Sequence, residues 1–287
     1  MTCVPDFSAT AVAMKPGKAP ESPALLRALV HRVTNGFSVE EYNRARSYGH
    51  EGYVESHLDH LSIDDSLIDG LLAPLEVLGM TAAQLNAANY PEPAYVVNQH
   101  KHGQIVRSIT SKRQLYERTV AFFTDHFSIY QKDGGVRFLK VVDDREVIRA
   151  NALGNFSDML RASAHSAAMC LYLDNNTNSV LGPQENYGRE LMELHTLGVD
   201  GGYDENDVKE AARCLTGWSF ERCTGCRPTA SLPTSPKITT TARRQYSARR
   251  SLQGKVRQTE TSCSRCSWDT FDGALPRSQA AEVVRSL

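Results

Sequence analysis

Apolar residues recur at the three- and four-residue spacing of helices along the first 220 positions, and the period-two alternation of strands is nearly absent. Ser22-Pro23 has the features of a helix start, because serine caps free N–H groups and proline lacks an N–H that would have no partner there. Ser38-Val39-Glu40-Glu41 has the form of a capping box, and its helix is predicted to end near Gly49. The pattern predicts an all-α architecture of roughly eight to ten helices over residues 20–220.

The breaks between later helices follow from proline, glycine and capping residues. Pro91 and Pro93 interrupt the chain ahead of residues 94–130, which are predicted to form two helices that meet near Gly103. Asp144 is expected to cap the helix that follows. Other helical segments are expected at residues 50–60, 64–80 and 81–88.

Residues 185–197, ENYGRELMELHTL, are predicted to form an amphipathic helix that Gly198 ends. At about 100° per residue, polar side chains gather on one arc of this helix, and these are Glu185, Asn186, Arg189, Glu190 and Glu193. The opposite arc carries Tyr187, Leu191, Met192, Leu194 and His195. Asp204 or Asn206 is expected to cap a second helix that packs against the first, with Trp218 holding the two together.

Four stretches carry a resemblance to a known family: FFTDHF (122–127), NALGNFSDML (151–160), LYLDNN (171–176) and residues 184–220. Over residues 24–220 the chain resembles the bacterial DUF1800 family, a domain of unknown function. Gln184 and Gly188 depart from the family pattern, which is close to NENYARE, and glycine inside a helix costs about 1 kcal/mol relative to alanine. The resemblance implies no specific activity, because that of the family is not established. Family members are often larger, exported proteins.

The charge of the chain changes sign near Phe220. Residues 221–287 hold 12 Lys and Arg against 5 Asp and Glu, a net charge of +7, and subtraction from the totals of 32 and 33 leaves 20 against 28, or −8. This tail is rich in Ser, Thr and Arg, lacks apolar periodicity, and does not continue the family sequence. We expect a disordered tail produced by a frameshift or truncation. Residues 21–220 would then be an incomplete helical domain, preceded by a disordered segment at residues 1–20.

Several classes of protein lack support in the sequence. No apolar run approaches the roughly 18–20 residues that cross a bilayer, so no transmembrane segment is expected. Residues 1–20 do not resemble a secretory signal, although the family is often exported, and localisation stays open. The negative charge of residues 1–220 argues against nucleic-acid binding by the helical domain. The chain has no G-x-S-x-G elbow, P-loop or dinucleotide-binding turn.

Two cysteine pairs in the tail, Cys223-x-x-Cys226 and Cys263-x-x-Cys266, have the spacing of zinc knuckles. The 36 residues between the pairs exceed the roughly 15–20 of the common arrangement. Sequence read out of frame and rich in serine and arginine also produces such pairs by chance. A zinc-binding tail is therefore an alternative to the main hypothesis, and zinc is the one cofactor that the sequence suggests.

The polar arc of residues 185–197 is the main candidate for chemistry. Glu185, Arg189 and Glu193 are spaced four residues apart and place a guanidinium between carboxylates, and Glu190 and His126 are the further catalytic candidates. Such residues form a solvated, salt-bridged helix face in many proteins. Because they belong to the signature of the family, they are predicted to join a polar cluster. The other members of this cluster are Asp125, Asp174, Asn175, Asn186 and His195.

Two functions remain open for this cluster. It can be a ligand or metal site, with or without enzymatic activity, or a structural network in a non-catalytic binding or assembly domain. Taken singly, His126 is expected to be a capping or core histidine, and His195 to be a core histidine.

Overall fold

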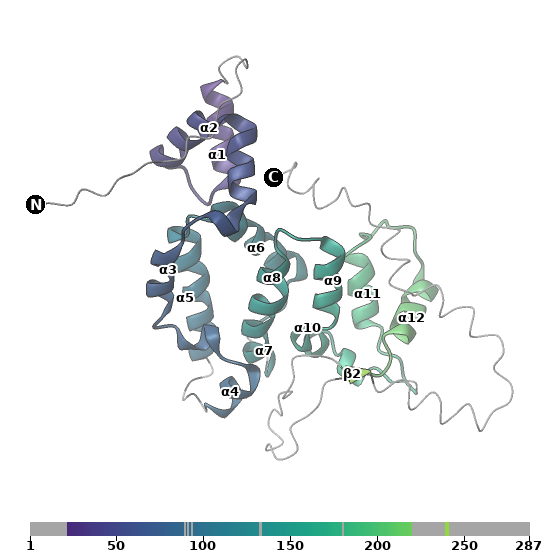
Figure 1. Ribbon diagram of the computed structural model, residues 1–287. Coiled ribbons are helices and arrows are strands. Elements are labelled where there is room, and N and C mark those ends of the chain that lie inside the picture. The colour runs from purple at the N-terminus through teal and green to yellow at the C-terminus, as the bar shows by residue number, and fades with distance from the viewer. Residues whose placement is uncertain are drawn as a thin grey trace, which may run out of the picture.

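The computed structural model describes residues 22–219, apart from 89, 91, 93, 132, 133 and 180, together with the backbone of residues 239–240. Within these residues the architecture is all-α except for one pair of two-residue strands, as the sequence predicts (Figure 1). The elements are α1 (Pro23–Val33), α2 (Val39–Leu58), η1 (His60–Ser62), α3 (Ser66–Leu72), η2 (Glu76–Gly79), α4 (Ala82–Ala87), α5 (Ala94–Thr110), α6 (Gln114–Phe127), α7 (Val136–Asp143), η3 (Asp144–Ile148), α8 (Arg149–Asn151), α9 (Phe156–Ala164), α10 (Ala167–Tyr172), η4 (Asn175–Thr177), α11 (Asn186–Glu193), α12 (Glu205–Cys214), β1 (Trp218–Ser219) and β2 (Thr239–Thr240). Residues 1–20 and most of the basic tail, with its four cysteines, lie outside the described residues.

Local capping chemistry fixes several helix starts where the sequence predicts them. Ser22 accepts a hydrogen bond from the Ala24 N–H at the start of α1. Asp204 caps α12 in a reciprocal capping box with Asp207, and Gly198 adopts a φ of 82° after α11. Such caps need only neighbouring residues, which explains why the sequence reveals them.

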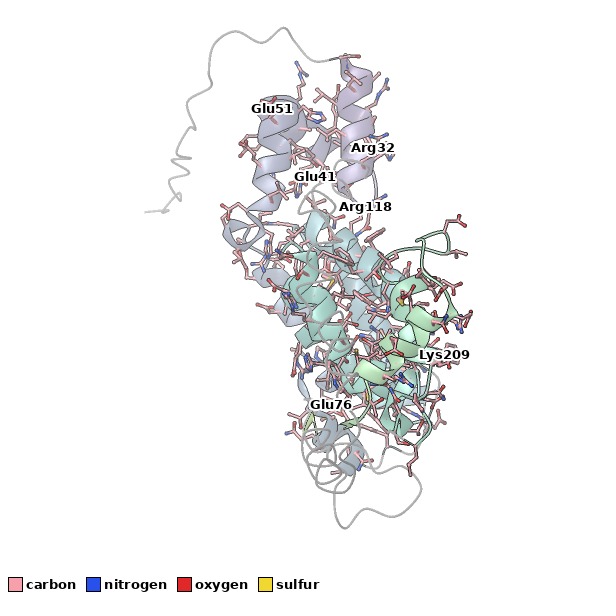
Figure 2. The ribbon with its side chains drawn as sticks, turned by 90° about the vertical axis from the view of Figure 1, so that its right-hand side faces the viewer. Arg32, Glu41, Glu51, Glu76, Arg118 and Lys209 are labelled. Atoms are coloured by element: carbon pink, nitrogen blue, oxygen red, sulfur yellow. The ribbon has the colours of Figure 1, made fainter. Side chains whose placement is uncertain are left out.

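Ser38 forms one half of its predicted capping box by accepting a hydrogen bond from the Glu41 N–H at 3.0 Å. The Glu41 side chain, labelled on α2 in Figure 2, instead accepts a hydrogen bond from the Tyr53 hydroxyl at 2.6 Å. Glu41 therefore joins the two halves of α2, which are separated by a kink at Gly49, where φ is 71°. The predicted interruption at Gly49 is confirmed as this kink.

The predicted helix junction at Gly103 is wrong, because α5 continues through this residue and ends at Thr110. A Cβ atom at Gly103 would lie 2.7 Å from the Leu78 Cδ1 atom. Glycine is used here for close packing of η2 on α5, not to break a helix.

The predicted cap at Asp144 is also wrong, because the backbone is helical on both sides of this residue and at the residue itself. The chain continues from α7 into a single π-helical turn, η3, and then into α8. The Asp144 side chain is buried and accepts a hydrogen bond from Arg149 Nε at 2.9 Å. Turns of this kind occur frequently at functional sites.

The largest apolar core lies between α6, α7, α9, α10 and α11. A smaller core joins α1, α2 and Leu115 of α6, so the first two helices project from one end of the molecule (Figure 1). Helices α11 and α12 pack together, as predicted, and close approach at Gly188 permits this contact. A Cβ atom there would lie 3.0 Å from the Ala212 nitrogen and 3.2 Å from the Val208 oxygen.

Trp218 lies elsewhere than predicted. Its indole ring stacks on the His165 ring, with 4.6 Å between centroids, and contacts the largest core instead of holding α12 against α11. Its strand, β1, pairs antiparallel with β2.

Candidate functional site

The structure places the polar arc of α11 on a partly exposed surface. Arg189 donates two hydrogen bonds to Glu205 of α12, at 2.8 and 2.7 Å, and its Nη2 lies 3.7 Å from Glu185. The side chains of Arg189 and Glu205 are 35% and 67% exposed. Glu205 was not among the predicted partners, because it lies 16 residues away on the next helix. Arg189 of the arc thus forms a surface ion-pair clasp, a bridge from α11 to Glu205 of α12.

The other predicted members of the cluster do not converge on Arg189. Asp125 and Asp174 are exposed. Asn175 is buried and accepts a hydrogen bond from Asn178, and the Asn186 amide lies 3.5 Å from the Leu173 oxygen.

Asn178, which the sequence did not single out, is the centre of this second group. Its amide donates to the Ala212 oxygen at 2.8 Å, and its Oδ1 accepts from the Gln184 N–H at 3.0 Å. It therefore ties the loop after α10 to α11 and α12.

His126 and His195 lie close together, with 6.1 Å between ring centroids, beside Phe127. Burial lowers the pKa of both, and the neighbouring His126 contributes to a value of about 4 for His195. Burial and the neighbouring Glu193 raise the pKa of Glu190. Among the described residues, no group of three or more His, Cys, Asp or Glu is arranged to hold a metal ion. The cysteine pairs of the tail lie outside those residues.

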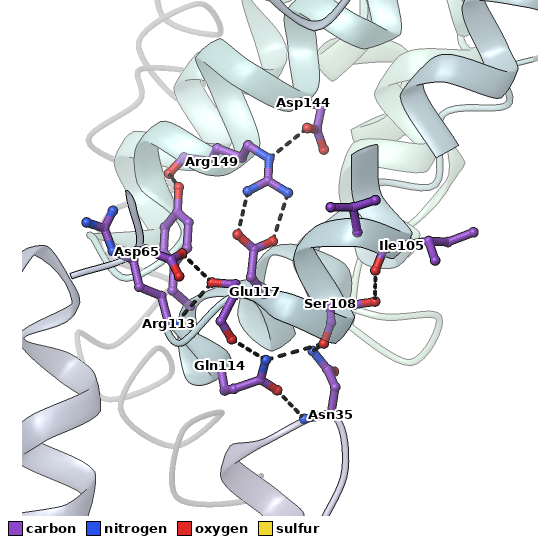
Figure 3. A network of polar contacts seen from close by, with 12 residues as sticks. Asn35, Asp65, Ile105, Ser108, Arg113, Gln114, Glu117, Asp144 and Arg149 are labelled. Atoms are coloured by element: carbon purple, nitrogen blue, oxygen red, sulfur yellow. Dashed lines mark hydrogen bonds and ion pairs between the residues drawn. The ribbon is translucent and has the colours of Figure 1, made fainter. Parts of the chain in front are cut away.

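A buried ionic network that sequence reasoning missed lies beneath the surface between α5, α6 and η3 (Figure 3). Arg149 donates two hydrogen bonds to Glu117, at 3.0 and 2.9 Å, and a third to Asp144. The three side chains are at most 12% exposed. Burial alone would raise the pKa of Asp144, but the adjacent His100 ring and the Arg149 charge hold it well below its usual value.

The residue before Asp144 faces a different environment. Asp143 accepts hydrogen bonds from Lys140 Nζ at 2.8 Å and from the Ser166 hydroxyl at 2.6 Å. All three residues are buried. The neighbouring carboxylates of Asp143 and Asp144 thus belong to two different networks, one with Lys140 and Ser166 and the other with Arg149 and Glu117.

Asp143 and Ser166 also line a cleft of about 180 Å³ between α7, η3, α9 and α10. We call it the Asp143 cleft, and its lining residues are Leu139, Val142, Asp143, Glu146, Val147, Ala162, His165, Ser166, Ala167 and Ala168. Apolar side chains form most of its wall. A few polar groups on an apolar wall are typical of small-molecule sites.

The sequence contained one signal for this region. In FLKVVDD, residues 138–144, Lys140 and Asp143 interrupt an apolar run at a spacing that places both on one helix face. Charges inside an apolar run are buried only when they are paired. The contacts made by Ser166, Glu117 and His100 in these networks each span 23 or more residues, and no local pattern reveals them.

None of the described helices is long and apolar enough to cross a membrane. No curated protein and no solved structure gives a significant match to this chain. A family model described as "Protein of unknown function (DUF1800)" matches residues 28–270, and so continues beyond Phe220, where the motifs seen in the sequence end. This match covers most of the chain, and the protein belongs to the DUF1800 family.

Proposed function

We propose that this protein is a small-molecule-binding domain and that its ligand occupies the Asp143 cleft. The observation that carries the proposal is the buried chain of contacts from Lys140 through Asp143 to Ser166, which ends in a mostly apolar hollow. Replacing a buried ion pair by apolar residues is often neutral or stabilising. A buried pair whose carboxylate lines a hollow is therefore better explained by ligand recognition than by stability.

The size of the cleft limits the ligand. Pockets for drug-sized molecules have roughly 300–1,000 Å³, whereas this cleft has about 180 Å³. A compact ligand of metabolite size fits such a space. The arrangement favours binding over acyl transfer, because the carboxylate beside the Ser166 hydroxyl already accepts a hydrogen bond from Lys140.

Three probes of equal length test the cleft: n-butylamine, n-butanol and sodium butyrate. We expect at least one to bind, detected by NMR shifts of residues around the cleft, and Ala162→Leu to abolish that binding because leucine fills the hollow. Ala121→Leu, at an exposed position of α6, is the matched control and should bind as the parent does. Failure of all three probes, or binding that Ala162→Leu leaves intact, contradicts the proposal.

A further inference from the structure

We infer that the ligand of the Asp143 cleft carries a hydrogen-bond-donating, positively charged head, a primary ammonium group, on a short apolar body. The inference rests on the function proposed above and names the class of ligand that the same cleft selects. It depends on which polar atoms of the cleft offer lone pairs and which offer hydrogens.

The Ser166 hydroxyl can offer only lone pairs to a ligand. A serine hydroxyl has one hydrogen, and that hydrogen is donated to Asp143 Oδ1 at 2.6 Å. The other Asp143 oxygen accepts from Lys140, whose side chain is 3% exposed. The floor of the cleft is therefore an acceptor surface in which the carboxylate orients the serine and Lys140 balances its charge.

The rim of the cleft is also an acceptor. Glu146 is 49% exposed and accepts from Arg145 Nη2 through Oε1 at 3.0 Å. A carboxylate has two oxygens, so this bond leaves acceptor capacity toward a ligand. Nη1 of Arg145 donates to the backbone oxygens of Leu78 and Met80, at 2.9 and 3.1 Å, and these bonds hold the guanidinium against η2.

No lysine or arginine occurs among the ten residues that line the cleft. His165 is the remaining basic group, and burial lowers its pKa, which favours the neutral ring at pH 7. A ligand with a carboxylate head would thus meet the lone pairs of Ser166 and Glu146, with no lysine or arginine among the lining residues. An ammonium head supplies three N–H donors, which match the Ser166 oxygen and the Glu146 carboxylate.

The walls determine the rest of the ligand. Leu139, Val142 and Val147 face the space from α7 and η3, and the alanines of α9 and α10 close it. An unbranched chain of a few carbons suits this wall, because apolar contact stabilises it and the small volume excludes larger bodies.

The experiment compares the affinities of n-butylamine, n-butanol and sodium butyrate at pH 7 by NMR titration of the full chain. Butylammonium should bind about tenfold more tightly than butyrate, as expected for one partly screened charge contact, with butanol between them. Glu146→Gln should reduce this preference several-fold. The matched control is Glu55→Gln, at an exposed position of α2 that does not line the cleft. It should leave the preference for butylammonium over butyrate unchanged.

The outcomes separate this inference from the proposed function. If butanol or butyrate binds as tightly as butylammonium and Ala162→Leu blocks the binding, the cleft is a binding site but the ammonium inference is overturned. If no probe binds, both are overturned. If Glu146→Gln keeps the full preference for butylammonium, the ammonium group does not contact Glu146, and that part of the inference is overturned.

Discussion

Arg149 and Arg189 each hold a glutamate through two hydrogen bonds, and they differ mainly in burial. Replacing Arg149 by methionine strands Glu117 and Asp144, both nearly inaccessible to water, and should lower the free energy of unfolding by about 3–5 kcal/mol. Arg189→Met removes a pair of similar geometry from an exposed surface, where water screens the charges, and should cost much less. Urea unfolding at pH 7 measures both values.

Equal costs for the two substitutions would show that burial does not decide the strength of these pairs. The comparison also tests the polar arc predicted from the sequence. If Arg189→Met unfolds the protein, the clasp between α11 and α12 is structural after all. An unchanged stability leaves Arg189 free to contribute to binding by this surface.

Helix starts were predictable because a cap depends on residues two or three positions apart, as at Ser22 and Asp204. Helix continuity was not. Gly103 and Asp144 have the residue types that interrupt helices, but each is held inside a helix by tertiary contacts, with Leu78 and His100 respectively. The same reason limited prediction of the site, since the contact between Ser166 and Asp143 spans 23 residues.

Glycines inside two helices should respond in opposite directions to alanine. At Gly188 a Cβ atom would approach backbone atoms of α12 to 3.0–3.2 Å, so Gly188→Ala should destabilise the protein by about 1–3 kcal/mol despite its better helix propensity. At Gly70 of α3 a Cβ atom would meet nothing within 4 Å, and Gly70→Ala should stabilise by about 0.5–1 kcal/mol. Thermal unfolding measures the change in stability of each variant relative to the parent protein. A gain in stability for Gly188→Ala would contradict close packing at that position.

The described chain combines one large core with a separate α1–α2 core at one end, and buried ionisable groups occur in both regions. In the α1–α2 core, burial would raise the pKa of Glu41, but contacts with His57 and Tyr53 lower it to about 2. In the larger region His195 has a pKa near 4 because of burial and the neighbouring His126. These groups make the folded protein sensitive to acid over two different ranges of pH.

His195 should govern the first loss of stability as the pH falls. Its pKa of about 4 in the folded state lies below the ordinary 6.5, so the unfolded chain binds the proton first and stability declines as the pH drops from about 6.5 toward 4. Between pH 7 and pH 5 the loss should be about 2 kcal/mol, and His195→Asn should remove it. The contribution of Glu41 is complete above about pH 5 and is lost only below that, toward pH 2. Urea midpoints at the two pH values separate these contributions, and an undiminished slope in His195→Asn would assign the acid sensitivity to another histidine.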